Sequence, residues 1–158
     1  MSLPPFDDVV AEHGRTVLRV CWAVVGPVDA EDAWSETFLS ALAAYPRLVA
    51  GSNVRAWLVT IAYRKAMDKL RSNQRAPIPI GMTLDGPFSD RELPDAELWA
   101  AVSALAPKQR GAVVAHYVGG LRYAEVAEFL GTSETAARRS AADGIAALRK
   151  VISGEDSM

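Results

Sequence analysis

The chain has 158 residues, of which 50% are apolar and 23% are charged, and its formal net charge is −2. This length suffices for one ordinary domain or two small ones, and this composition favours a packed core and excludes global disorder. The single cysteine, Cys21, excludes an internal disulfide, and one cysteine with two histidines cannot supply a four-ligand zinc site.

The N-terminus has neither the basic segment nor the apolar segment of a signal peptide. Val20–Val28, the longest apolar run, is interrupted by Gly26 and Pro27 and is too short to cross a bilayer. We therefore expect a cytoplasmic protein without membrane insertion.

Apolar residues recur at helical spacing almost throughout, and no segment has the period of two of a strand. Helices are predicted at Phe6–Val25, from Asp29 to Pro46, and from Ser52 to about Ser72. The second of these helices is expected to bury one stripe of side chains, which comprises Ala30, Ala33, Trp34, Thr37, Phe38, Ala41, Leu42 and Tyr45.

Residues 76–95 contain four prolines, two glycines and four acids, a composition typical of an extended linker. Four more helices are predicted beyond it, at about 95–105, 107–119, 122–130 and 133–151. The sequence thus predicts an all-α protein with two small helical domains, residues 1–75 and 95–154, joined by a flexible linker at 76–94.

The C-terminal domain contains the pattern of a helix-turn-helix. Ala127 is small enough for a close helix crossing, and Gly131, four residues later, provides the positive φ that the turn requires. Thr132 or Ser133 can cap the second helix, and Glu134 suits its dipole. An ordinary helical hairpin is the alternative. The candidate DNA-binding residues are Thr132, Ser133, Glu134, Thr135, Arg138 and Arg139.

The third helix is basic, because residues 53–75 hold six Lys/Arg and one acid. Residues 1–52, in contrast, hold three Lys/Arg and seven acids. Arg64, Asp68, Arg71 and Arg75 are spaced to share one face. A cationic face near an aromatic ring can capture single-stranded nucleic acid. The alternative is that this face is only exposed to solvent and that Trp57 packs against a neighbouring side chain. The candidate residues are Arg55, Trp57, Arg64, Lys65, Lys69, Arg71 and Arg75.

The remaining polar residues are interpreted as structural. His13, His116 and Cys21 lie in helices without ligand-like partners, and the sequence contains no phosphate loop or dinucleotide fingerprint. We therefore expect no catalytic residue, no cofactor and no metal. The acids within Asp29–Asp32 can be explained by capping at a helix start.

Two sets of segments together resemble a known family. Asp29-Ala30-Glu31-Asp32, Glu36-Thr37-Phe38-Leu39, Arg55-Ala56-Trp57-Leu58, Ile61-Ala62 and Asp68-Lys69-Leu70-Arg71 resemble region two of bacterial RNA polymerase sigma factors of the extracytoplasmic-function (ECF) class. The second set resembles region four of the same proteins. It comprises Leu105-Ala106-Pro107-Lys108-Gln109-Arg110, Tyr117, Gly120-Leu121, Tyr123-Ala124-Glu125-Val126-Ala127, Leu130-Gly131 and Ser133-Glu134.

This resemblance implies a non-enzymatic protein that binds core RNA polymerase and directs transcription initiation. Asp29, Asp32 and Glu36 would dock on the β′ clamp, and the basic helix would melt and capture the promoter element nearest the start site. The helix-turn-helix would read the distal element while resting on the β flap. An anti-sigma factor is the expected regulatory partner, since no sensory domain is apparent.

Two segments depart from the family pattern. Tyr63-Arg64 stands where the family usually has Arg-Asn, and Ala137-Arg138-Arg139-Ser140-Ala141 replaces Val-Lys-Ser-Arg-Leu in the recognition helix. This recognition helix motivates an alternative, a sigma mimic that sequesters an anti-sigma factor without reading DNA. A DNA-binding regulator that never contacts polymerase is a third hypothesis, against which the basic helix argues.

Overall fold

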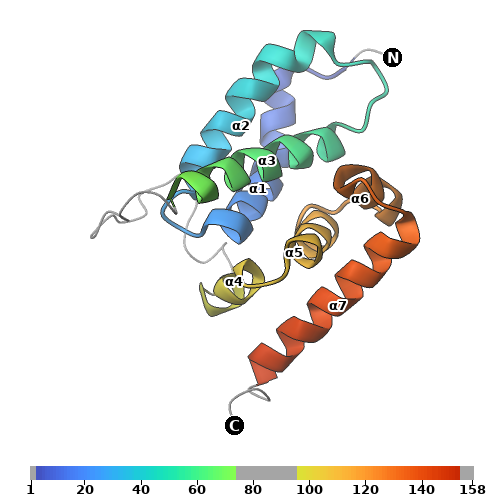
Figure 1. The fold of residues 1–158 in the computed structure, drawn as a ribbon. Coiled ribbons are helices and arrows are strands. Elements are labelled where there is room, and N and C mark those ends of the chain that lie inside the picture. The colour runs from blue at the N-terminus through green and yellow to red at the C-terminus, as the bar shows by residue number, and fades with distance from the viewer. Residues whose placement is uncertain (1–2, 74–95, 154–158) are drawn as a thin grey trace.

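The computed structural model describes residues 3–73 and 96–153, and every element in these ranges is helical (Figure 1). The predicted flexible linker at 76–94 and Arg75 lie outside the described residues. The N-terminal elements are α1 (Phe6–Val25), α2 (Ala30–Ala44), the 3₁₀ turn η1 (Tyr45–Arg47) and α3 (Val54–Asn73). The C-terminal elements are α4 (Ala96–Ser103), α5 (Pro107–Val113), the π-helical turn η3 (Val114–Val118), α6 (Tyr123–Leu130) and α7 (Glu134–Ser153).

The N-terminal domain packs α1, α2 and α3 around one core. Small residues on α2, such as Ala33 and Ala41, are fully buried and allow the helices to approach closely. Phe6, Phe38 and Tyr45 form edge-to-face ring contacts at one end of this core. The predicted buried stripe of α2 is wrong at Leu42, which is 52% exposed because it follows the fully buried Ala41 and so points about 100° away from it around the helix.

The C-terminal domain packs α5 and α6 against the long helix α7. Its core includes Val113, Val126 and Ala141, and Trp99 of α4 is also buried. The two domains contact each other, since α4 and η3 both lie against α1. Figure 1 shows α3 in the middle of the molecule, with α1 passing behind it, α2 on one side and the C-terminal helices on the other.

Two glycines inside helices differ sharply in the space around them. A Cβ atom at Gly144 of α7 would lie 2.6 Å from Cγ2 of the buried Val113, whereas one at Gly14 of α1 would lie 3.7 Å from Trp34, at ordinary contact distance. We expect Gly144→Ala to lower the free energy of unfolding by about 1–3 kcal/mol through overpacking. Gly14→Ala, the matched control, should raise it by up to about 1 kcal/mol. Urea denaturation of both variants measures the difference, and a stabilising Gly144→Ala would contradict the packing.

Candidate nucleic-acid interface

The turn of the helix-turn-helix has the predicted geometry. Gly131 adopts a left-handed conformation at φ 67° and ψ 39°. The amide of Thr132 donates to the carbonyl of Ala127 at 2.9 Å, and the amide of Gly131 donates to Glu128 at 3.2 Å, which together form a Schellman motif. Ser133 caps α7, because its Oγ accepts a hydrogen bond from the amide of Ala136 at 3.1 Å. Both predictions for the turn are therefore confirmed.

The start of α7 carries the candidate base-reading residues. Thr135, Arg138 and Arg139 are exposed, and Arg138 donates from Nη2 to Oε1 of Glu134 at 2.9 Å. Farther along the helix, Ala141 is buried and Asp143 is exposed. The structure thus leaves two arginines as the cations of this surface within the first two turns of α7.

A groove between α3 and the C-terminal domain brings together part of the predicted basic face. Its volume is about 340 Å³, and its lining comprises Tyr63, Arg64, Met67, Asp68, Arg71, Pro107, Lys108, Phe129 and Leu130. The rings of Tyr63 and Phe129 meet edge to face at 5.0 Å and form an aromatic part of the wall. Burial raises the pKa of the Tyr63 hydroxyl, so this phenol stays neutral at physiological pH. The groove combines aromatic rings with three cations, a combination typical of proteins that bind single-stranded nucleic acid.

The arginines of this groove are exposed and differ in their partners. Nη1 of Arg71 lies 3.3 Å from Oδ1 of Asp68, an exposed pair that contributes little to stability. No carboxylate of the described residues lies within ion-pair distance of Arg64. Lys108, which sequence analysis did not single out, joins them from α5, and only the tertiary packing reveals this contribution.

Lys69 does not line the groove between α3 and the C-terminal domain. Its Nζ is 3.6 Å from Oδ2 of Asp32 and 3.7 Å from Oε1 of Glu36, so it faces α2 rather than the groove. Of its side chain, 24% is exposed. A residue predicted to bind DNA is thereby paired with two residues predicted to bind polymerase.

The other candidates on α3 have mixed surroundings. Trp57 is half-buried, and its ring centroid lies 6.2 Å from that of Tyr45, which fits the alternative that it packs against a neighbour. Arg55 is exposed near the start of α3, and Lys65 is half-buried. The structure therefore does not gather all the predicted cations on one open surface.

The C-terminal domain covers one face of α3. Glu125 accepts hydrogen bonds from the side chain of Asn53 and from the backbone amide of Arg122, the latter at 2.9 Å. A Cβ at Gly119 would lie 2.8 Å from Val59, which shows how closely the domains approach.

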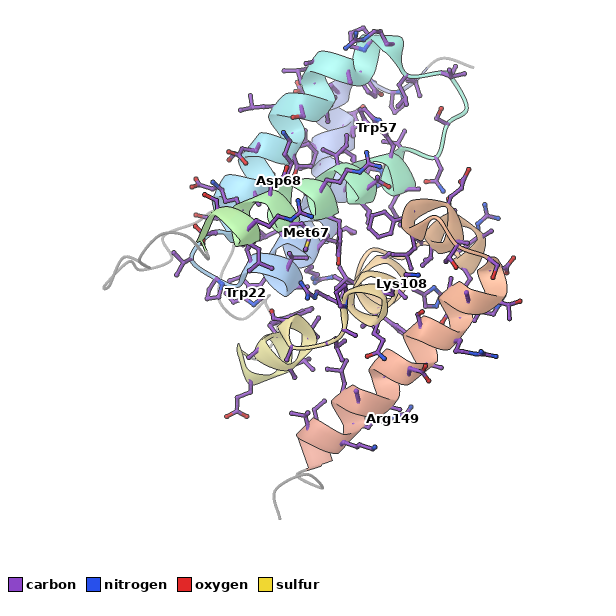
Figure 2. The ribbon with its side chains drawn as sticks, viewed as in Figure 1. Trp22, Trp57, Met67, Asp68, Lys108 and Arg149 are labelled. Carbon is purple, nitrogen blue, oxygen red and sulfur yellow. The ribbon has the colours of Figure 1, made fainter. Side chains whose placement is uncertain are left out.

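Arg110 reaches across the same domain contact toward Met67. Figure 2 shows Met67 on the side of α3 that faces α5. Nη1 of Arg110 lies 3.6 Å from Met67 Sδ, its Nη2 lies 3.4 Å from the carbonyl of Leu105, and its buried Nε has no hydrogen-bond partner in the described structure. These are weak partners for a guanidinium, and an unpaired buried polar group costs free energy. Arg110 therefore adds little hydrogen bonding to the domain contact.

The acidic helix α2 presents an exposed surface to possible partners. Asp32, Glu36 and Leu39 follow a spacing of four and three residues, and all three are exposed, Leu39 to 66%. Leu42 extends the apolar part of this surface. The side chain of Asp29 makes no capping hydrogen bond, but Asp29 is the N-cap residue of α2 and Glu31 and Asp32 lie in its first turn, where the helix dipole favours acids.

The residues interpreted as structural have different roles. Burial lowers the pKa of His13, and it raises the pKa of Cys21 to about 12, which keeps this thiol protonated and unreactive. His116 belongs to an aromatic stack that sequence analysis missed.

Residues 3–73 and 96–153 contain no group of three or more side chains suited to holding a metal, and no helix there is long and apolar enough to span a membrane.

An all-helical, two-domain protein with a helix-turn-helix and a basic helix belongs to the broad class of DNA-binding proteins. Comparison with protein families makes the class specific: sigma-70 region 2 matches residues 9–76, and sigma-70 region 4 matches residues 95–148. The chain belongs to the sigma-70 family of RNA polymerase sigma factors, and within it to the ECF type.

Individual relatives agree with this assignment. The ECF sigma factor BldN of Streptomyces coelicolor is 34% identical, over 83% of this chain and 54% of that protein. The sigma factor CarQ of Myxococcus xanthus is 32% identical, over 93% of this chain and 88% of that protein. The chain spans about half the length of several curated relatives that it matches.

A solved structure shares the fold. The sigma factor RpoE of Bartonella quintana, in complex with the anti-sigma factor NepR, superposes with a TM-score of 0.68 at 20% identity. The superposition covers 93% of this chain and 98% of that one.

Proposed function

We propose that this chain is a sigma factor that binds core RNA polymerase and directs promoter recognition and transcription initiation. The observation that carries the proposal is the occurrence of both sigma-70 regions, in order, on a chain whose second region forms a capped helix-turn-helix. On this proposal the chain acts by binding rather than by catalysis. It would act in the cytoplasm, where polymerase and promoter DNA are found.

We assign the promoter-facing surfaces as follows. Arg64 and Arg71 of α3 would contact phosphates of the melted strand near the start site, whereas Lys108, which faces them in this structure, would move away with the C-terminal domain. The start of α7 would enter the major groove of the distal element, with Arg138 and Arg139 as its cations. The remaining proposed DNA contacts are Arg55, Trp57, Lys65, Arg75, Thr132, Ser133, Glu134 and Thr135.

The two promoter elements lie apart on the DNA, so the two domains would have to separate in order to read both. The weakly partnered Arg110 in the domain contact supports this separation, since little hydrogen bonding is lost when Met67 leaves it. Separation would also uncover the face of α3 that carries Tyr63. The proposed domain limits are 1–75 and 95–154, with 76–94 as the connection.

The proposed protein partners are core polymerase and an anti-sigma factor. Asp29, Asp32 and Glu36 would dock on the β′ clamp, and the C-terminal domain would rest on the β flap. RpoE of Bartonella quintana, which shares the fold, forms a complex with the anti-sigma factor NepR. By analogy, an anti-sigma factor would hold this chain away from polymerase.

Run-off transcription after selection from a random promoter library tests the proposal. We expect the chain with a competent core enzyme to enrich one promoter sequence and to produce a transcript from it. Arg138→Ala with Arg139→Ala should reduce transcript several-fold, because each good base contact contributes about 1–3 kcal/mol of discrimination. Core enzyme alone is the control for background initiation.

The exposed Asp143 and the shortage of cations along α7 favour one competing function, the sigma mimic. If no sequence is enriched and no transcript appears, while the chain binds an anti-sigma factor, the mimic is correct and our proposal is wrong.

A further inference from the structure

The junction between α5 and α6 holds a stack of planar side chains on the surface of the helix-turn-helix. The imidazole of His116 lies 3.9 Å from the ring of Tyr123, with only 16° between the two planes. The Cζ atom of Arg138 lies over the same tyrosine ring, 4.6 Å from its centroid. Because the imidazole covers one face of the ring, the guanidinium must occupy the other.

The backbone fixes the His116 end of this stack. Nδ1 of His116 lies 2.7 Å from the carbonyl oxygen of Leu121, and since a carbonyl can only accept, Nδ1 carries the hydrogen and donates it. Tyr117 meets the imidazole edge to face at 4.8 Å. His116 and Tyr117 belong to the π-helical turn η3, a geometry that is rare and is often found at functional sites.

The guanidinium of Arg138 contacts Glu134 through its edge, in addition to the Tyr123 ring. Its Nη2 donates to Oε1 of Glu134 at 2.9 Å, and 59% of its side chain remains exposed. A planar guanidinium has five N–H donors, so most of them stay available to a ligand. Arg139, the next residue, is also exposed but has no ion pair or ring contact within the described residues.

We propose that Tyr123 and His116 are positioning residues that hold the Arg138 guanidinium ready for contact with duplex DNA, although neither ring touches the DNA itself. The inference rests on the proposed function. An arginine loses rotamer entropy when a contact fixes it, and fixing it beforehand reduces that loss. The stack thereby compensates for a recognition helix that has few cations.

Three variants distinguish the contact between the tyrosine ring and Arg138 from a general effect on the fold. Tyr123→Phe keeps the stacking ring and should bind promoter DNA as the parent does. Tyr123→Leu removes the ring and should weaken holoenzyme binding to the selected promoter about 3- to 10-fold, as expected for losing a cation–π contact and the order it imposes. Arg138→Lys keeps the charge, loses the planar group, and should show the same loss without risk to the fold.

A double-mutant cycle in the holoenzyme decides whether Tyr123 acts through Arg138. We expect Tyr123→Leu to cause no further loss in an Arg138→Ala background, whereas it should cause its full loss in an Arg139→Ala background. Equal losses in both backgrounds would overturn the inference, and so would normal binding by Arg138→Lys.

Nuclear magnetic resonance of the full chain without polymerase tests the positioning directly. The Arg138 Nε–Hε signal should be shifted by the tyrosine ring current in the parent and in Tyr123→Phe, and should move to the random-coil position in Tyr123→Leu. An unshifted signal in the parent would overturn the inference even if transcription succeeds. A shifted signal in a chain that enriches no promoter would instead count against the proposed function.

Discussion

Reversing the charge of Arg64 and Arg71 together is expected to reduce promoter opening at least tenfold while leaving the association with polymerase intact. Both guanidinium groups are exposed at the groove between α3 and the C-terminal domain, and neither supports the core. Losing two contacts with single-strand phosphates should also flatten the salt dependence of DNA binding by about 1.4 units in log–log slope, and reversed charges repel the strand further.

Permanganate footprinting of the selected promoter measures the opened bases. Arg149→Glu is the control for charge reversal as such, because it reverses one charge at an exposed position near the far end of α7, away from α3 (Figure 2). Equal opening by the parent and by the Arg64→Glu/Arg71→Glu variant would show that this face of α3 does not capture the melted strand. Weaker opening by Arg149→Glu as well would indicate a general charge effect.

The local features of this fold could be predicted from the sequence because their causes are local. Helix α1 begins and ends at the predicted residues, Phe6 and Val25. The left-handed Gly131 and the cap by Ser133 depend on residues within one turn of each other, so the helix-turn-helix was also predictable. Capping and turn chemistry at Gly131 and Ser133 could therefore be recognised before any tertiary contact was considered.

The surroundings of α3 could not be predicted, because they depend on where the C-terminal domain lies. Val59, Ala62, Ala66 and Leu70 are spaced to share one face of α3, and the first three are buried. The structure adds cover from the C-terminal domain on a second face, where Phe129 packs against Tyr63. A helix covered on two sides has no single polar face, so the predicted cations are distributed among different neighbours.

Single residues on α7 illustrate the same limit. Helix propensity alone treats Gly144 as a defect, whereas the structure shows that α5 leaves no space for a side chain there. The partners of Arg138 come from α7 itself and from the start of α6, at Tyr123. The pair with Glu134 follows from a spacing of four residues, but the ring contact requires the tertiary fold.

The largest expected effect concerns the acidic surface of α2. Asp32→Lys with Glu36→Lys should abolish association with core polymerase, because it reverses two exposed charges beside the exposed Leu39 on the surface that we assign to docking. The new lysines would also face Lys69, which lies 3.6 and 3.7 Å from the native carboxylates, so attraction becomes repulsion at this edge. Pull-down with core enzyme measures the loss.

Two further variants distinguish docking from general charge. Asp8→Lys with Glu12→Lys places the same change, at the same spacing, on exposed positions of α1 and should leave association unchanged. Lys69→Gln frees Asp32 and Glu36 from their internal partner, so it should preserve or modestly strengthen association and leave promoter opening intact, since Lys69 faces away from the groove. If the α2 double variant still binds core enzyme like the parent, this helix is not the docking surface. If Lys69→Gln instead loses promoter opening, Lys69 contributes to DNA binding. Its ion pairs with Asp32 and Glu36 would then have to break when the chain binds the promoter.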